Sequence, residues 1–141
     1  MPPDDVKRRV EGLQESLREL DWIAVVPQHF LHVSAPASAA EWRSVAPFPI
    51  AYRRVNCFHD AVIVEAHADG AFPAPPFLPH LSIGYFRRSE GVKPLREALA
   101  PLRDAELGIG VVKEIVLCEV PNAKTTFLGP WRVLVRVRLG G

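Results

Sequence analysis

Apolar residues recur at helical spacing in two long stretches of the chain. The apolar positions within residues 4–20 are Val6, Val10, Leu13, Leu17 and Leu20. They follow one another at steps of four, three, four and three, which marks one face of a 3.6-residue period and predicts an amphipathic helix. Residues 92–102 show the same pattern and predict another helix. Between them, residues 38–41 form a capping-box pattern that predicts a short helix carrying Trp42.

Apolar runs of strand length predict extended segments in most of the remaining chain. We expect them at residues 22–26, 29–35, 50–55, 61–66, 80–86, 111–120 and 132–139. In the last run Val133, Val135 and Val137 take every second position, as on one face of a strand. Residues 71–79 hold four prolines, which fit neither a helix nor a central strand and predict an extended connector. This order of elements predicts one α+β domain over residues 1–141, built from two similar halves.

Composition and charge narrow the class of protein. The 141 residues are 48% hydrophobic and 23% charged, as in soluble globular proteins, and the net charge is +1. We expect a cytoplasmic protein without a membrane segment, because no apolar run is long enough and the N-terminus lacks a secretory signal. Cys57 and Cys118 are too few for a disulfide framework or a four-cysteine zinc site. Residues 121–141 carry four basic and no acidic side chains, which predicts a solvated strand face or a phosphate-facing patch.

One short element occurs twice, and it carries the candidate chemistry. The tripeptides His32–Ser34 and His80–Ser82 both have the form His-x-Ser, and each lies in an apolar extended run. Side chains two residues apart share one face of a strand, so each strand presents an imidazole beside a hydroxyl. If the two strands face one another across a cleft, two imidazoles and two hydroxyls converge on a space about the size of a phosphate.

This pair of motifs resembles the mark of the two-histidine (2H) phosphoesterase superfamily, which includes 2′-5′ RNA ligase-like proteins and RNA 2′,3′-cyclic phosphodiesterases. The similarity covers most of residues 4–139, including the helix before Trp22 and the turn at residues 55–58. It implies two pseudo-symmetric lobes of antiparallel strands, with flanking helices, around a central cleft. The chain departs from the family in having no strand before the first helix and serine where threonine is commoner in the motifs.

The resemblance implies metal-independent hydrolysis of 2′,3′-cyclic phosphates, on nucleotides or RNA ends, with no cofactor. Two imidazoles that titrate near neutral pH can serve as acid and base, and we expect His32 to be the acid and His80 the base. The hydroxyls of Ser34 and Ser82 would then bind the non-bridging phosphoryl oxygens, where negative charge must be stabilised.

Further residues are candidates for contact with the substrate. Phe30 and Phe86 fall on the strand faces of the motif histidines, where they would stack on a base or pack the floor of the cleft. Gly84 on the same face would leave room for a ligand or mark a bulge. Many family members carry an arginine soon after the second motif, and Arg87, followed by another arginine, is the candidate here. The 5′ side of the substrate would run toward Lys124 and the last strand.

Other interpretations stay open. His29, His32, His59 and His67 are nitrogen donors for a metal, although positions 29 and 32 point to opposite faces of a strand and no acidic or thiol ligand accompanies them. Cys57 with His59 nearby is a candidate nucleophile, and a buried structural thiol is the alternative. Instead of cyclic-phosphate hydrolysis, the motifs also fit hydrolysis or ligation of 2′-5′ linkages, or a non-catalytic RNA- or nucleotide-binding module.

Overall fold

The computed structural model describes residues 1–34, 42–58, 60–68, 79–88, 90–119 and 131–140. The helices are α1 (Asp4–Arg18) and α3 (Val92–Leu99), and the 3₁₀ turns are η1 (Gln28–Phe30) and η2 (Ala100–Leu102). The strands are β1 (Ile23–Val25), β2 (Val33–Ser34), β3 (Phe48–Cys57), β4 (Ala61–His67), β5 (His80–Phe86), β6 (Glu106–Val112), β7 (Glu114–Glu119) and β8 (Arg132–Arg138). No helix in this part of the chain is long and apolar enough to span a membrane.

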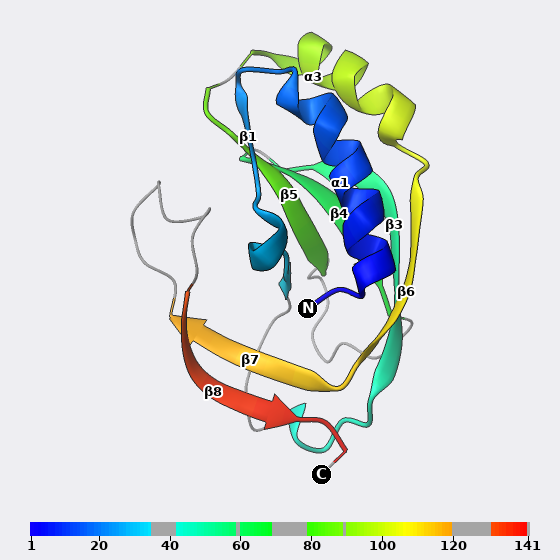
Figure 1. The fold of residues 1–141 in the computed structure, drawn as a ribbon, viewed down its shortest axis with the longest axis vertical. Coiled ribbons are helices and arrows are strands. Elements are labelled where there is room, and N and C mark those ends of the chain that lie inside the picture. Colours follow the sequence, from blue (N-terminus) through cyan, green and yellow to red (C-terminus); the bar gives the residue numbers. More distant parts are fainter. Residues whose placement is uncertain (35–41, 59, 69–78, 89, 120–130, 141) are drawn as a thin grey trace.

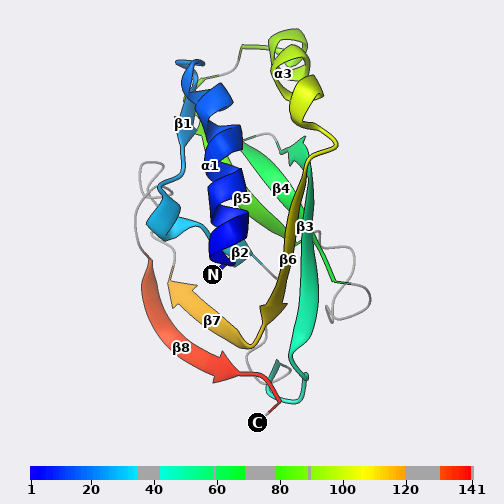
Figure 2. The same cartoon turned by 45° about the vertical axis from the view of Figure 1, so that its right-hand side comes forward.

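Most strands belong to one antiparallel sheet, which we call the main sheet. Its order is β1-β5-β4-β3-β6, and β2 pairs with β5 beside β1. Strands β7 and β8 form a separate two-stranded sheet. In Figures 1 and 2, α1 lies along one face of the curled main sheet, α3 lies near one end, and the β7–β8 ribbon crosses the other end. The fold is therefore α+β, as the order of predicted elements indicates.

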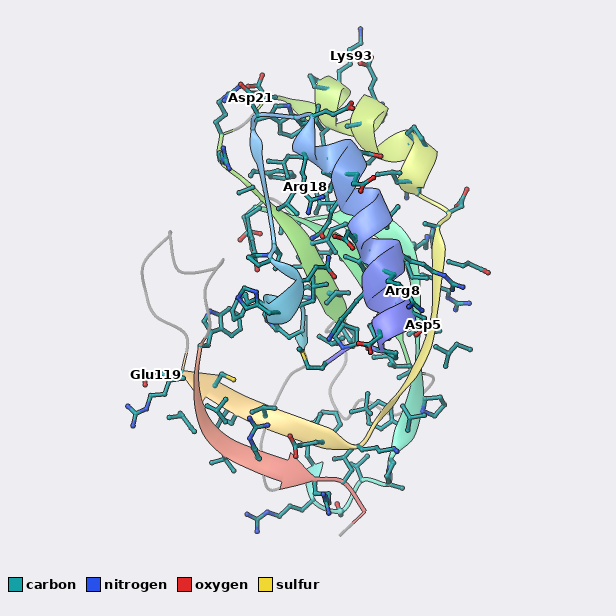
Figure 3. All side chains as sticks on the ribbon, in the orientation of Figure 1. Asp5, Arg8, Arg18, Asp21, Lys93 and Glu119 are labelled. Atoms are coloured by element: carbon teal, nitrogen blue, oxygen red, sulfur yellow. The ribbon has the colours of Figure 1, made fainter. Side chains whose placement is uncertain are left out.

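Helix α1 confirms the apolar pattern of the N-terminal stretch. Val6, Val10 and Leu17 are buried and join the core with the strand residues beneath the helix. Asp4 and Asp5 occupy the first turn, where a negative charge is favourable to the helix dipole. Charged side chains on the other side of α1 and on α3 point outward from the sheet (Figure 3). The helix thus covers the face of the main sheet that carries the core.

One polar residue, Gln14, is fully buried in this apolar stripe. Its Nε2 donates to the carbonyl of Val26, at 2.8 Å, and to that of Ile83, at 2.9 Å. Its Oε1 accepts from Gln28 Nε2 at 2.7 Å. A buried amide is tolerated because its polar atoms have partners. The side chain ties α1 to the end of β1, to the middle of β5 and to η1.

Strand β5 contains a β-bulge. The consecutive β4 residues Val62 and Ile63 pair with Gly84 and Ser82 of β5, so that Ile83 is the extra residue. An extra residue shifts the alternation of side chains, so every position after the bulge changes face. A Cβ atom on Gly84 would lie 2.8 Å from Ile23 Cγ2, on the side of α1. The interpretation of Gly84 as a bulge position is confirmed, and its expected place on the face of the motif histidines is wrong.

Two predicted strands are broken in the structure. Residues 29–35 begin with the 3₁₀ turn η1 instead of a strand. Pro27, with φ −59°, precedes this turn, and the Phe30 N–H donates to the Pro27 carbonyl at 2.9 Å. The run at 111–120 is divided at Lys113 between β6 of the main sheet and β7 of the small sheet. Strand β6 begins at Glu106, before the predicted start at residue 111. The prediction missed these first residues because two of them are glycines, which have low strand propensity.

A second, smaller core lies where the β7–β8 ribbon meets the main sheet. It consists of Trp42, Phe48, Val137 and Leu139. The predicted alternation in the last strand is confirmed only at this end, because Val133 is 42% exposed. The predicted helix start at residues 38–41 and the proline-rich connector up to residue 78 lie outside the described residues.

Candidate functional site

The two His-x-Ser tripeptides lie side by side in the main sheet. Val33 of β2 pairs with Leu81 of β5, and Ser34 pairs with His80, in antiparallel register. The tripeptides therefore run in opposite directions on neighbouring strands. The expectation that their strands face one another across a cleft is wrong, because they are hydrogen-bonded partners in one sheet. Leu81 is fully buried in the core under α1, which fixes this register and turns His80 and Ser82 to the opposite face.

We call this opposite face, which carries His80 and Ser82, the motif face. His32 lies directly before β2. Its Nδ1 is 2.8 Å from the carbonyl oxygen of Phe30, and since a carbonyl only accepts, Nδ1 carries the proton and Nε2 the lone pair. The ring also has edge contacts with Phe30, at 5.1 Å between centroids, and with Trp131, at 4.5 Å.

The environment of His32 favours the neutral imidazole. Burial is the main cause that lowers its pKa below the ordinary 6.5, and the nearby charges of the N-terminus and His80 lower it further. The hydrogen bond to Phe30 acts in the opposite direction and is outweighed. At neutral pH, His32 therefore offers an unprotonated nitrogen, which is the form that accepts a proton from water.

On β5, His80 and Ser82 have neighbours that the sequence did not indicate. The His80 ring makes an edge contact with Phe58, at 4.7 Å between centroids. The Ser82 side chain is hydrogen-bonded to the Tyr85 hydroxyl, and burial raises the pKa of Tyr85, with a further contribution from the charge of Asp60. Tyr85 reaches Ser82 because the bulge turns position 85 toward the motif face.

Of the candidate substrate contacts that lie in the described part of the chain, only Phe30 lies beside a motif histidine. Phe86 packs against Trp22, at 5.8 Å between ring centroids, and belongs to the core under α1. The expectation that Phe86 shares the face of the motif histidines is wrong because it assumes unbroken alternation, and the bulge reverses it. Arg87 follows β5, at about 20 Å from His80 along the strand, so the structure does not bring the two together. Lys124 lies outside the described residues.

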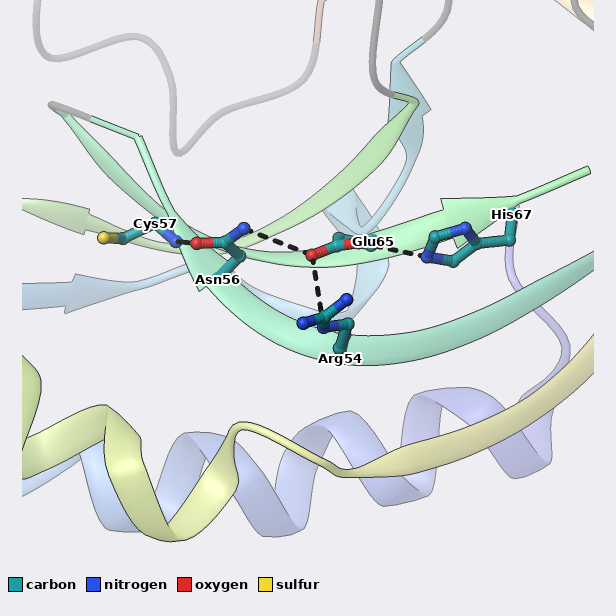
Figure 4. Close-up of polar contacts among 5 residues, drawn as sticks. All are labelled: Arg54, Asn56, Cys57, Glu65 and His67. Atoms are coloured by element: carbon teal, nitrogen blue, oxygen red, sulfur yellow. Dashed lines mark hydrogen bonds and ion pairs between the residues drawn. The ribbon is translucent and has the colours of Figure 1, made fainter.

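A polar cluster on the motif face was missed by the sequence analysis. Glu65 of β4 pairs with His80 across the β4–β5 ladder and is only 6% exposed. Its Oε1 accepts from His67 Nε2 at 3.0 Å, and its Oε2 accepts from Asn56 Nδ2 at 3.1 Å (Figure 4). The Arg54 guanidinium lies 4.0 Å from the same Oε2. A charged residue inside the apolar run of residues 61–66 was the signal that could have found this cluster.

A cavity of 720 Å³ opens beside His32, and it is also lined by Ile50 and Tyr52 from the face of the main sheet that carries the core. Residues of β3, β6, β7 and β8 form most of its wall, and many of them are aliphatic, among them Ile50, Val112 and Ile115. Trp131 stands at the wall next to His32, and the only charged pair that lines it among the described residues is Arg136 with Glu114, 2.8 Å apart. The cavity therefore suits an apolar or aromatic group.

Metal ligands do not gather in the described part of the chain. No group of three histidine, cysteine, aspartate or glutamate side chains there has a geometry that could hold an ion. His29 lies exposed in η1, while His67 is bonded to Glu65. Cys57 is a half-buried free thiol at the end of β3, and its possible partner His59 lies outside the described residues.

Comparison with known proteins gives a likeness of fold. No protein-family model and no curated protein matches the chain. Among solved structures, the protein TT0787 of Thermus thermophilus is similar with a TM-score of 0.68 and 18% sequence identity, over 99% of this chain and 94% of that chain. The name TT0787 states no activity. At this identity the likeness shows the shared α+β fold alone.

Proposed function

We propose that this protein is a two-histidine phosphodiesterase that hydrolyses 2′,3′-cyclic phosphates, on nucleotides or RNA ends, without a metal. The observation that carries the proposal is the antiparallel pairing of the two His-x-Ser tripeptides, with Ser34 opposite His80. Membership in the 2H superfamily, a two-lobed architecture in which the paired motif strands lie side by side rather than across the cleft, and a cytoplasmic location belong to the same proposal.

The reaction needs one proton acceptor and one proton donor near a single phosphorus atom. The water oxygen forms a bond to phosphorus while one ribose oxygen leaves, and the cyclic diester becomes a phosphomonoester. The base takes a proton from the water, and the acid gives one to the departing ribose oxygen. The hydroxyls of Ser34 in the first motif and Ser82 in the second would stabilise the negative charge on the phosphoryl oxygens.

The surroundings of the histidines favour His32 as the base, which reverses the assignment expected from the sequence. Its proton is on Nδ1, bound to the Phe30 carbonyl, and its lowered pKa keeps Nε2 unprotonated at neutral pH. His80 then acts as the acid. After the first turnover the proton gained by His32 and the one lost by His80 are exchanged with solvent.

The test is an assay of the purified chain with 2′,3′-cyclic, 3′,5′-cyclic and 2′-5′-linked substrates, read by product mass and phosphate position. We expect turnover of the 2′,3′-cyclic substrate, in the presence of EDTA as well, and a loss of about 10²- to 10⁴-fold in His32→Ala and in His80→Ala. His29→Ala is the matched control, because His29 is an exposed histidine three positions before His32.

Each other outcome contradicts a defined part of the proposal. Near-wild-type turnover in either motif variant, with unchanged thermal stability, contradicts the acid–base pair. Turnover of the 2′-5′ linkage alone keeps the mechanism and removes the cyclic phosphate as substrate. Binding of all substrates without turnover indicates a nucleotide-binding module instead of an enzyme.

A further inference from the structure

Arg54 stands at a second irregularity of the main sheet. Tyr52 of β3 pairs with Ala66 of β4, and Val55 pairs with Val64, so Arg53 and Arg54 together lie opposite Glu65. Arg54 has φ 72°, a backbone conformation that is uncommon for a side chain of this kind. Without the bulge, position 54 would face α1, as Tyr52 does. The bulge therefore directs a guanidinium toward Glu65, on the motif face.

The contact with Glu65 does not use the hydrogen-bond donors of Arg54. Both Glu65 oxygens already accept a hydrogen bond, one from His67 and one from Asn56. Arg54 Nε lies 4.0 Å from Oε2, which is beyond hydrogen-bond distance. Its side chain is 52% exposed, whereas that of Glu65 is 8% exposed. An approaching ligand therefore meets the cation, and the carboxylate lies beneath it.

The sheet register sets the separation of this cation from the candidate catalytic histidine. Glu65 pairs with His80, and Arg54 lies on the next strand beyond Glu65. Two strand spacings put Arg54 about 10 Å from His80, measured across the sheet. That is too far for contact with a phosphate held at His80, and it suits the neighbouring phosphate of an extended nucleotide chain. Arginine binds phosphate well because its planar N–H groups match two oxygens at once.

We propose that the Arg54 guanidinium binds a second phosphate of the substrate, on the 5′ side of the nucleotide that carries the cyclic phosphate. In a nucleotide with a 2′,3′-cyclic phosphate, only the 5′ position remains for another phosphate, so the direction follows from the chemistry. The inference rests on the proposed function and deepens it, since it selects RNA ends or 5′-phosphorylated nucleotides over simple cyclic mononucleotides. Glu65, held by Asn56 and His67, is the positioning residue for Arg54.

The experiment compares kcat/KM for three substrates: adenosine 2′,3′-cyclic phosphate, the same compound with a 5′-phosphate, and a dinucleotide ending in the cyclic phosphate. We expect the wild type to prefer the two substrates with a second phosphate by about 10- to 100-fold, the range for a hydrogen bond to a charged group. In Arg54→Gln this ratio falls to about one. Arg53→Gln, in the same bulge and also exposed, keeps the ratio. Preference for the dinucleotide alone identifies RNA ends as the source of the phosphate.

A binding measurement separates this inference from the proposed function. By titration calorimetry we expect adenosine 3′,5′-bisphosphate to bind the wild type about tenfold more tightly than adenosine 3′-monophosphate, and Arg54→Gln to lose the difference. If the wild type turns over no cyclic phosphate but shows this difference, the proposed function fails and the phosphate site stands. If the ratio in Arg54→Gln equals that of the wild type in both measurements, the Arg54 site is wrong and the hydrolase is unaffected.

Discussion

Replacement of Gln14 by leucine removes a connection that holds η1, β1 and the bulged strand β5 together. The change deletes the two hydrogen bonds that Gln14 Nε2 donates, to the carbonyls of Val26 and Ile83, at 2.8 and 2.9 Å. It also deletes the one that Gln14 Oε1 accepts from Gln28 Nε2, at 2.7 Å. The Ile83 carbonyl still accepts from the Val26 N–H at 3.0 Å. For the Val26 carbonyl, no other donor is found among the described residues. Only one buried acceptor is therefore left without a partner.

The expected loss of stability follows from this count. An unsatisfied buried carbonyl destabilises by about 1–3 kcal/mol, and the other two lost bonds add about 1 kcal/mol each. Burial of the leucine side chain offsets part of this, so we expect Gln14→Leu to lower the free energy of unfolding by about 2–3 kcal/mol. The measurement is urea unfolding followed by circular dichroism. Glu15→Leu is the control, because Glu15 is exposed on the same helix. A loss below about 0.5 kcal/mol, the range of ordinary surface changes, would refute the reasoning.

Three further predictions concern the bulge and the candidate site. Gly84→Ala places a Cβ atom 2.8 Å from Ile23 Cγ2 and should destabilise the fold by about 1–3 kcal/mol. Gly12→Ala in α1 is the control, because its added Cβ atom meets no atom within 4 Å and should not destabilise the fold. Equal free energies of unfolding in the two variants would contradict the bulge geometry. Tyr85→Phe removes the hydroxyl bonded to Ser82 and should lower kcat by about 3- to 10-fold in the wild type, but leave kcat unchanged in a Ser82→Ala background. Tyr52→Phe is the control. An equal effect of Tyr85→Phe in both backgrounds rules out action through Ser82. The pKa of His32 is lowered in the folded protein, so below pH 6.5 its imidazole binds a proton more readily in the unfolded chain. The free energy of unfolding should therefore fall as the pH drops below 6.5, and the acid limb of the pH profile of kcat/KM should lie below the same value. An acid limb above pH 6.5 contradicts His32 as the base.

Local patterns of the sequence predicted the elements, and tertiary pairing decided their details. The stripe Val6–Val10–Leu17 predicted α1 because a helix buries one face whatever it packs against. The alternation rule failed in β5, where it put Phe86 on the motif face. Whether a strand contains a bulge depends on the partner strand, and the β4 register that inserts Ile83 is not visible in β5 itself.

The candidate site shows the same division. The His-x-Ser pattern pointed to His32 and His80 as candidates, because an imidazole and a hydroxyl two residues apart can be recognised in the sequence alone. Their arrangement on paired strands depends on a contact between segments 48 positions apart, from residue 32 to residue 80, and no local pattern reports it. Glu65 was hidden for another reason, since a run of apolar neighbours makes a strand prediction insensitive to the one charged residue inside it.

The bulge at Ile83 joins the stability of the fold to the chemistry proposed for the motif face. It turns Tyr85 toward Ser82 and turns Gly84 toward α1, where no side chain fits beside Ile23. At the same place the strand ladder is interrupted, and Gln14 of α1 supplies the donor that the Val26 carbonyl lacks. The β-bulge at Ile83 therefore requires both a glycine at position 84 and the amide donor of Gln14. Since Gln14 also accepts from Gln28, at the start of the turn that leads to His32, the same side chain connects the segments that carry both motif histidines.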